Sequence, residues 1–252
     1  MQKGLKSRFI IHEILKSLKN KSLTFDKLFE DCKIKYKLNN SDKKLIHNVV
    51  LSSMRYNLTT EQIINKYSKK VKKNSNEYFL LLSSITQIVF LDFKEYAVIN
   101  TTVELAKINK MKTYHGFINA ILRNICREKK ILYKIKDHFE SLPNWFKEKL
   151  GHLSEKERFV LLHTLKEKPQ LHIVFKNEKN INKFQNYIKT SEYSIAIENT
   201  NQIEKLPGYN SGDWWVQDFS SMMPLYLSKN LSNKSVVDMC SAPGGKSFQL
   251  LK

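Results

Sequence analysis

The segment Cys240–Ser247, with the sequence CSAPGGKS, holds residue types that bind a cofactor. It ends in Gly-Lys-Ser, as a phosphate-binding P-loop does, but that motif also needs a glycine five positions before Gly245, where the chain has Cys240. Cysteine disfavours the left-handed backbone of a phosphate nest, and Pro243 removes one N–H donor. The pattern therefore argues against a nucleoside triphosphate site.

Residues on both sides of this loop favour another cofactor. The segment Ser235–Met239 predicts a buried strand with an acidic residue, Asp238, near its end, and a helix is expected from about Lys246. Open α/β sheets bind ligands at the carboxyl ends of strands, and Gly244 and Gly245 let a ligand approach the backbone. The arrangement suits a cofactor with a compact polar head, such as the amino-acid end of S-adenosylmethionine.

The elements that must position this loop differ between the two halves of the chain. Residues 5–135 show apolar residues at helical spacing throughout, with Ser41-Asp42 as one helix start and residues 78–91 as a buried central helix. No glycine lies between Gly4 and Gly116, which is typical of a compact helical bundle.

The second half has a mixed pattern. Residues 171–175 predict a strand, Ile181, Phe184 and Ile188 a helix, and residues 193–197 a second strand. Further along, the sequence predicts a loop at 207–212, a short strand at 214–216, and a helix capped by Asp218. Trp214 and Trp215 are expected in the core, with stacking on nucleic-acid bases as the alternative. We expect a mainly α fold with three parts: an all-α helical bundle at 1–137, a small α+β module at 138–212, and the first strand, loop and helix of an incomplete Rossmann-like domain at 213–252.

The charge of the chain is concentrated in its first part. The net charge is +19, and residues 1–140 carry 28 Lys and Arg against 13 Asp and Glu. Such a surface attracts polyanions, and nucleic acid is the first expectation. Lysine outnumbers arginine 38 to 5, so a compositional bias toward lysine is the alternative explanation.

The cysteine, histidine and hydropathy patterns exclude several classes of protein. Cys32, Cys126 and Cys240 form no Cys-x-x-Cys pair, which argues against a disulfide scaffold and for a reducing, cytoplasmic compartment. Cys126 lies on the apolar side of its helix and is expected in the core. The histidines show no metal-ligand spacing, and no apolar run reaches the length of a membrane span. The basic, amphipathic N-terminus is similar to a transit peptide, but the acidic Glu13 interrupts the basic pattern.

Two segments of the second half resemble one enzyme family. Residues 237–247 resemble the first cofactor motif of the RNA cytosine-5 methyltransferases of the RsmB/Nop family, typically Leu-Asp-x-Cys-Ala-Ala-Pro-Gly-Gly-Lys-Thr, with Ser241 and Ser247 as departures. Val216–Ser221 resembles that family's Val-Gln-Asp-x-Ser-Ser element. The resemblance implies that S-adenosylmethionine contacts seven consecutive residues: Cys240, Ser241, Ala242, Pro243, Gly244, Gly245 and Lys246.

The helical half resembles the RNA-binding domain that bacterial members of this family carry, which is similar to the antitermination factor NusB. Gly116–Arg123 resembles that domain's Gly-Phe-Val-Asn-Ala-Val-Leu-Arg signature, and Asn100–Lys107 resembles its neighbouring helix. At the end of the signature and just beyond it lie four cations that we expect to contact RNA phosphates: Arg123, Arg127, Lys129 and Lys130. A solvated helix end, where cations complement the helix dipole, is the alternative.

The resemblance implies methyl transfer to carbon 5 of a cytosine in small-subunit rRNA. In the family, a cysteine thiolate adds to carbon 6, so that carbon 5 becomes nucleophilic, and a second cysteine helps release the enzyme. Both catalytic cysteines lie in later motifs that match none of the three cysteines here. We therefore expect the N-terminal part of such a methyltransferase, monomeric and inactive by itself. The alternative is a non-enzymatic NusB-like RNA-binding module.

Overall fold

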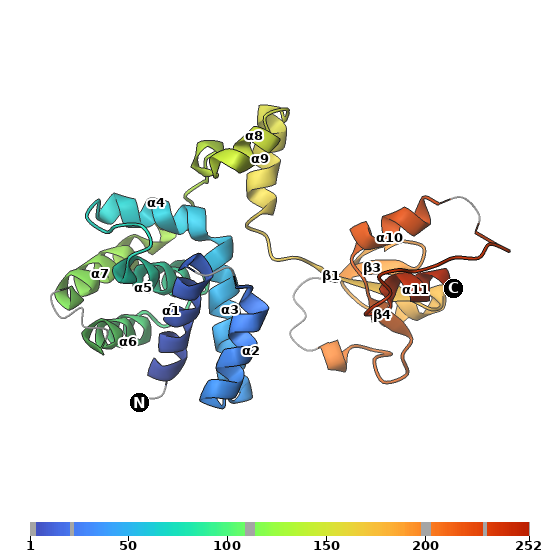
Figure 1. Cartoon of the computed structure of the whole chain (residues 1–252), viewed down its shortest axis with the longest axis horizontal. Coiled ribbons are helices and arrows are strands. Elements are labelled where there is room, and N and C mark those ends of the chain that lie inside the picture. Colours follow the sequence, from blue (N-terminus) through green and yellow to red (C-terminus); the bar gives the residue numbers. More distant parts are fainter. Residues whose placement is uncertain (1–3, 21–22, 109–113, 198–202, 229–230, 252) are drawn as a thin grey trace. The chain divides into compact units, whose positions relative to one another are not determined.

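The computed structural model describes residues 4–20, 23–108, 114–197, 203–228 and 231–251. The chain forms two compact units, residues 1–167 and 168–252 (Figure 1). The first unit contains α1 (Leu5–Asn20), α2 (Phe25–Tyr36), α3 (Asn40–Arg55), α4 (Asn57–Tyr67), α5 (Asn76–Ile85), the π-helix η1 (Thr86–Phe90), α6 (Glu95–Ile108), α7 (His115–Leu132), the short 3-10 helix η2 (Phe139–Ser141), α8 (Asn144–Lys149) and α9 (Glu155–Thr164).

The core of the first unit is built around α5, and the predicted central helix is confirmed. Ser75 caps α5 by accepting a hydrogen bond from the Tyr78 N–H, and every residue from Tyr78 to Val89 is buried. At Thr86 the helix widens into η1, where the Leu91 N–H donates to the Thr86 carbonyl at 3.1 Å. The helix is buried all round because neighbouring helices pack against it. Its polar side chains donate to backbone carbonyls of the preceding turn, which satisfies them inside the core: Ser83, Ser84, Thr86 and Gln87.

Helix starts in this unit follow local capping chemistry. The predicted start at Ser41-Asp42 is wrong by about two residues, because Asn39 is the N-cap of α3 and its side chain accepts from the Asp42 N–H at 2.8 Å. Asparagine and serine are both strong N-caps, so the sequence alone does not choose between neighbours of this kind.

The second unit contains a four-stranded antiparallel sheet. Its strands are β1 (Leu171–Phe175), β2 (Tyr187–Ser191), β3 (Ser194–Ile197) and β4 (Trp214–Val216), in the order β2-β3-β1-β4. The strand predictions at 171–175, 193–197 and 214–216 are confirmed. The predicted helix over Ile181, Phe184 and Ile188 is wrong in part, since only η3 (Glu178–Lys183) is helical, as a 3-10 helix, and Ile188 lies in β2.

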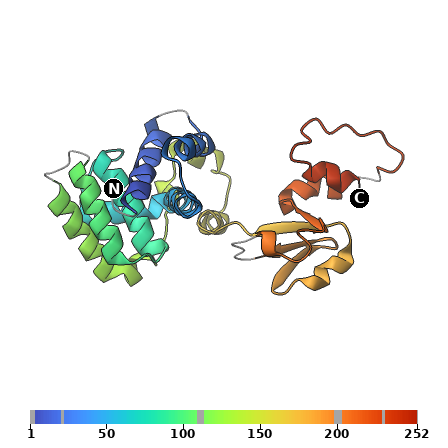
Figure 2. The same ribbon diagram turned by 90° about the horizontal axis from the view of Figure 1, so that it is seen from below.

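The two faces of this sheet are covered by different segments. Ile173, Phe175 and Ile195 point to one face and pack with Ile181 and Phe184 of the η3 region. On the opposite side lie α10 (Phe219–Tyr226) and α11 (Gly245–Leu250) (Figure 2). Trp214 is buried in the sheet core, as predicted, whereas Trp215 is half-buried.

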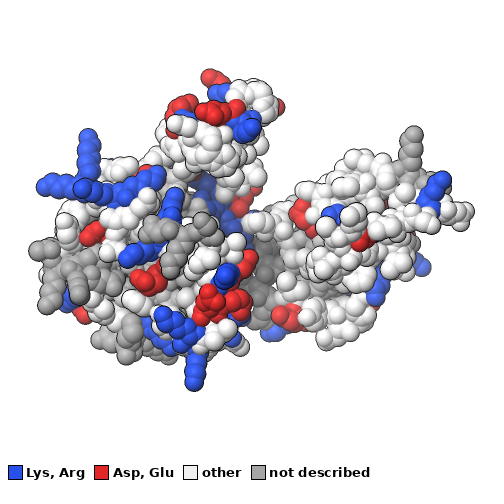
Figure 3. Space-filling model, viewed as in Figure 1, with Lys and Arg blue, Asp and Glu red and all other residues white. Residues whose placement is uncertain are grey.

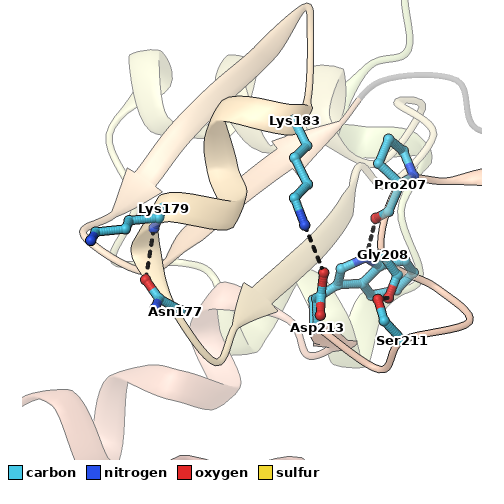
Figure 4. A network of polar contacts seen from close by, with 8 residues as sticks. Asn177, Lys179, Lys183, Pro207, Gly208, Ser211 and Asp213 are labelled. Atoms are coloured by element: carbon cyan, nitrogen blue, oxygen red, sulfur yellow. Dashed lines mark hydrogen bonds and ion pairs between the residues drawn. The ribbon is translucent and has the colours of Figure 1, made fainter.

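Polar contacts fasten the loop before β4, which was predicted at residues 207–212. The Lys183 ammonium pairs with Asp213 at 3.0 Å, and the Ser211 hydroxyl donates to the Gly208 carbonyl at 3.3 Å (Figure 4). The Trp214 indole N–H donates to the Pro207 carbonyl at 2.7 Å. These bonds fix the loop at the edge of the sheet. They therefore fix the position at which β4 and the helix after it begin.

The segment Ser235–Met239 does not form the predicted strand. It has no regular secondary structure, and the side chains of Val237 and Met239 are 83% and 91% exposed. Among the described residues, none pairs with this segment as a neighbouring strand. A strand needs a partner for its backbone groups, so the apolar pattern by itself does not create one.

Helices α8 and α9 belong to the same compact unit as the bundle. The Lys166 ammonium, just after α9, pairs with Asp137 at 3.1 Å and donates to the Ile135 carbonyl at 3.2 Å. The division into domains at 1–137, 138–212 and 213–252 stays a prediction. Within the described parts of the chain, each helix is too short or too polar to span a bilayer.

Candidate functional site

The candidate cofactor loop is organised by the carboxylate of Asp238. One oxygen, Oδ1, accepts from the Cys240 N–H at 3.2 Å, and the other, Oδ2, accepts from the Ser247 hydroxyl at 2.7 Å. The carboxylate thus ties the entrance of the loop to the first turn of α11. We expect that these two hydrogen bonds fix the conformation of the loop and leave the backbone of residues 241–244 accessible to a ligand.

Gly244 occupies a position that only glycine adopts without strain. Its φ of +107° lies in the left-handed half of backbone space, and it directly precedes α11 as the N-cap residue. A Cβ at this position would lie 3.1 Å from the ring of Phe248. The glycine therefore serves both the turn and the close packing of the loop on the helix that follows it.

The structure brings the two sequence motifs of this unit together. A Cβ on Gly245 would lie 3.4 Å from the side chain of Gln217, which is buried. Gln217 accepts from the Trp215 indole N–H at 2.8 Å and donates to Gln249 at 3.1 Å. Gln249 in turn donates to the Met222 carbonyl at 3.1 Å. The segment 216–221 therefore supports the loop from one side.

Asp218, the other polar residue of that segment, caps α10 as predicted. Its carboxylate accepts from the Ser220 N–H at 3.0 Å and lies 3.1 Å from the ring of His172. Burial raises the pKa of Asp218, but the hydrogen bonds from Ser220 outweigh it and hold the pKa below its usual value. Asp218 is therefore an ionised cap, and its role in this structure is to begin a helix.

The seven predicted cofactor-contacting residues lie in one continuous surface turn. Cys240 to Pro243 and Lys246 are exposed, whereas Gly244 and Gly245 are half-buried between Gln217 and Phe248. Small side chains, open backbone groups and an internally bonded carboxylate fit the polar amino-acid head of S-adenosylmethionine. The described residues include no cluster of side chains that would hold a metal ion.

The four predicted RNA-contacting cations on α7 have different surroundings. Arg123 and Arg127 are exposed and, among the described residues, donate to neutral amides, Asn119 at 3.3 Å and Asn124 at 3.5 Å. Lys130 is also exposed, whereas Lys129 is half-buried and paired with Asp92. In the described part of the chain, Arg123, Arg127 and Lys130 have no carboxylate within ion-pair distance. These three are thus available to an external anion.

Other charges of the first unit are spread more evenly. Figure 3 shows Lys and Arg side chains over the visible face of this unit, with Asp and Glu side chains between them. Several of the lysines pair with acids, such as Lys66 with Glu128 at 2.6 Å and Lys73 with Glu61 at 2.7 Å. The high lysine count alone therefore does not mark an anion-binding site.

The three cysteines are free thiols, of which Cys32 and Cys126 are half-buried and Cys240 is exposed. Cys126 is half-buried against the core of the first unit, and burial raises the pKa of its thiol to about 11. Burial also raises the pKa of Cys32. Cys240 is exposed in the loop. Neither Cys32 nor Cys126 has the depressed pKa of a nucleophilic thiolate.

Sequence reasoning did not identify the partners that fix the loop. Ser247 was noted only as a departure from the family motif, yet its hydroxyl is the second donor to Asp238. Phe248 and Gln249 were not singled out, although they hold Gly244 and Gln217 in place. A hydroxyl at the first turn of the following helix is the one signal in the sequence that predicts part of this support.

Comparisons with known proteins support the two-part organisation. Residues 5–127 match the NusB family. The chain is similar to the probable ribosomal RNA small subunit methyltransferase B of Coxiella burnetii, with 24% identity over 236 residues, covering 85% of this chain and 54% of the relative. The ribosomal RNA small subunit methyltransferase B of Pasteurella multocida is 22% identical over 263 residues, covering 98% of this chain and 58% of that protein.

One solved structure resembles nearly the whole chain. The crystal structure of PH0851 matches with a TM-score of 0.53 and 12% identity, covering 99% of this chain and 61% of that chain. At this identity the match shows that the fold is shared. This chain spans somewhat more than half the length of its curated relatives.

Proposed function

We propose that this chain, which begins with a NusB domain and resembles small-subunit rRNA methyltransferases along most of its length, is the RNA-binding part and first cofactor loop of an S-adenosylmethionine-dependent rRNA cytosine-5 methyltransferase. The observation that carries the proposal is the joint packing of two motifs. The loop at Gly245 rests on Gln217, and both come from segments that resemble cofactor-site elements of that family.

The residues of the chain have separate tasks in this proposal. When bound, S-adenosylmethionine supplies an electrophilic methyl group. Asp238 holds the loop in its turn through Cys240 and Ser247, and Gly244 leaves the backbone accessible to the amino-acid head. The exposed cations of α7 contribute to holding the RNA by its phosphates.

We also propose that the 252-residue chain by itself does not catalyse methyl transfer. Attack on carbon 6 of cytosine requires a thiolate, and the raised pKa values of Cys32 and Cys126 keep those thiols protonated at neutral pH. Cys240 lies in the turn assigned to the cofactor, where a thiol forms part of the wall of the pocket. We expect the chain to be monomeric and to reside in the reducing cytoplasm.

The test combines cofactor binding, RNA binding and turnover on the purified chain. We expect salt-dependent binding of a small-subunit rRNA transcript, binding of radiolabelled S-adenosylmethionine that is lost in Gly244→Val, and no methyl transfer. ATP and GTP serve as competitors, since a phosphate loop would bind them through Lys246. Methyl transfer by the chain alone would overturn the proposed inactivity, and nucleotide binding lost in Lys246→Ala would overturn the cofactor assignment.

A non-enzymatic RNA-binding module is the second candidate. It is favoured by the family match, which is confined to residues 5–127, and by the separate hydrophobic core of the first unit. This candidate predicts RNA binding without any binding of S-adenosylmethionine. Salt-dependent binding of rRNA by the intact chain, with no detectable binding of S-adenosylmethionine, would favour it over the methyltransferase proposal.

A further inference from the structure

Three aromatic rings from distant parts of the first unit form a cluster near the end of α7, in which two rings stack and the third is tilted. Tyr56, after α3, lies 4.1 Å from Phe90 of η1 with an interplanar angle of 7°. The ring of Tyr133, just after α7, packs against the same Phe90 ring in a tilted arrangement, with a centroid distance of 6.1 Å and an interplanar angle of 42°. Tyr56 and Phe90 are half-buried, but Tyr133 is 62% exposed.

The exposed end of this stack lies next to positive charge. Arg123, Arg127 and Lys130 are spaced by four and three residues and therefore form one stripe along α7. Tyr133 is three residues beyond Lys130, about a quarter of a turn around the helix from the stripe.

Nearby acids do not neutralise the stripe. Asp92 pairs with Lys129, and Glu128 pairs with Lys66 at 2.6 Å, so both carboxylates are directed to other partners. In the regions that the structure describes, the stripe cations therefore keep their charge available for an external polyanion. Tyr133 is 62% exposed, so its ring is accessible to a ligand while it also packs against Phe90.

We infer that the exposed Tyr133, supported by Phe90 and Tyr56, is a stacking platform for one unpaired RNA base, with the adjacent phosphates held by Arg123, Arg127 and Lys130. Single-stranded nucleic acids are bound by this combination of an aromatic surface and a cationic track. In a duplex the base faces are occupied by their neighbours, so the platform selects unpaired RNA. The inference rests on the proposed RNA-binding function and names the form of RNA that this surface takes.

The experiment measures fluorescence anisotropy of the full chain with three labelled probes of equal length: oligoadenylate of ten nucleotides, an abasic ribose-phosphate strand, and a ten-base-pair RNA duplex. We expect Tyr133→Ala to weaken binding of oligoadenylate about 5- to 150-fold, as for the loss of one stacked base, without affecting the abasic strand. Arg127→Ala should weaken both single strands and lower the salt slope by about 0.7.

Matched variants separate stacking from damage to the fold. Tyr133→Phe keeps the ring and should bind as the original chain does, whereas Tyr133→Leu keeps apolar packing on Phe90 and should lose affinity. Tyr96 on α6 is 65% exposed, and Tyr96→Ala serves as a control that should bind normally. Circular dichroism and thermal unfolding establish that each variant is folded.

The outcomes separate this inference from the function on which it rests. Equal affinity of Tyr133→Ala and the original chain for oligoadenylate would overturn the stacking platform, and an effect of Arg127→Ala would then still support RNA binding. A chain that binds none of the probes at low salt would overturn both. If Tyr133→Ala changed self-association and left RNA affinity alone, the surface would be a protein-docking face and the inference would be wrong.

Discussion

Asp137 joins α4 to the segment after α9 and provides a quantitative test of how the first unit is held together. Its carboxylate is 4% exposed. Oδ1 accepts from the Thr59 hydroxyl at 2.7 Å and from the Gln62 amide at 3.3 Å, while Oδ2 pairs with the Lys166 ammonium at 3.1 Å. Substitution of Asp137 by alanine removes all three contacts at once.

The expected loss of stability follows from what remains unpaired. The Thr59 hydroxyl is buried, and an unsatisfied buried donor costs about 1–3 kcal/mol. Breaking a fully buried ion pair costs about 3–5 kcal/mol, but the Lys166 side chain is 23% exposed and partly regains water. We therefore expect Asp137→Ala to lower the free energy of unfolding of this unit by about 2–4 kcal/mol, and Lys166→Met by about 1–2 kcal/mol.

Tryptophan fluorescence reports on this unit alone once Trp214 and Trp215 are replaced by phenylalanine, because Trp145 is the third of the three tryptophans in the sequence. Urea titrations of the two single variants and the double variant give the coupling energy of the pair, expected at about 1 kcal/mol. Additive effects within about 0.3 kcal/mol would refute the ion pair as a link between α9 and the bundle.

Three further predictions concern the loop, a buried histidine and the thiols. Gly244→Ala should destabilise the loop and weaken S-adenosylmethionine binding, measured by calorimetry, because its φ is +107° and the new Cβ would lie 3.1 Å from Phe248. Burial lowers the pKa of His12, so the free energy of unfolding should fall as the pH drops below about 6.5. The substitution His12→Gln should make the free energy of unfolding depend less on pH in that range. Cys240 should react rapidly with Ellman's reagent at pH 8, whereas Cys126, with a pKa of about 11, should react slowly; equal rates would contradict the structure.

The parts of the fold that the sequence predicted are those set by local pattern. The buried helix over residues 78–91 and the strand over 171–175 are each dominated by apolar residues within one short segment, and both were found. The cap at Asp218 was also correct, because a short acidic side chain before an apolar run has one favourable use. In these cases propensity, periodicity and burial agree.

The errors and omissions lie where distant residues decide the outcome. Ile188 fitted a helical spacing but pairs in β2, since the neighbouring strand β3 offers backbone partners that a single-sequence pattern does not contain. The contacts of Asp137 span 75 and 78 residues, and the stack of Tyr56, Phe90 and Tyr133 joins the ends of three elements. Nothing in the local sequence predicts such pairs.

The segment Ser235–Met239 shows how a correct motif and a wrong secondary structure occur together. Its apolar pattern predicts a buried strand, but a strand is stable only if another strand completes its hydrogen bonds and another layer covers its apolar side chains. The loop beyond it keeps its turn regardless, because Asp238, Ser247 and Gly244 fix it through contacts within ten residues. The conformation of the cofactor loop is thus determined by short-range contacts, whereas the strand before it needs a neighbouring strand in a sheet. This difference explains why the structure contains the loop and lacks the strand.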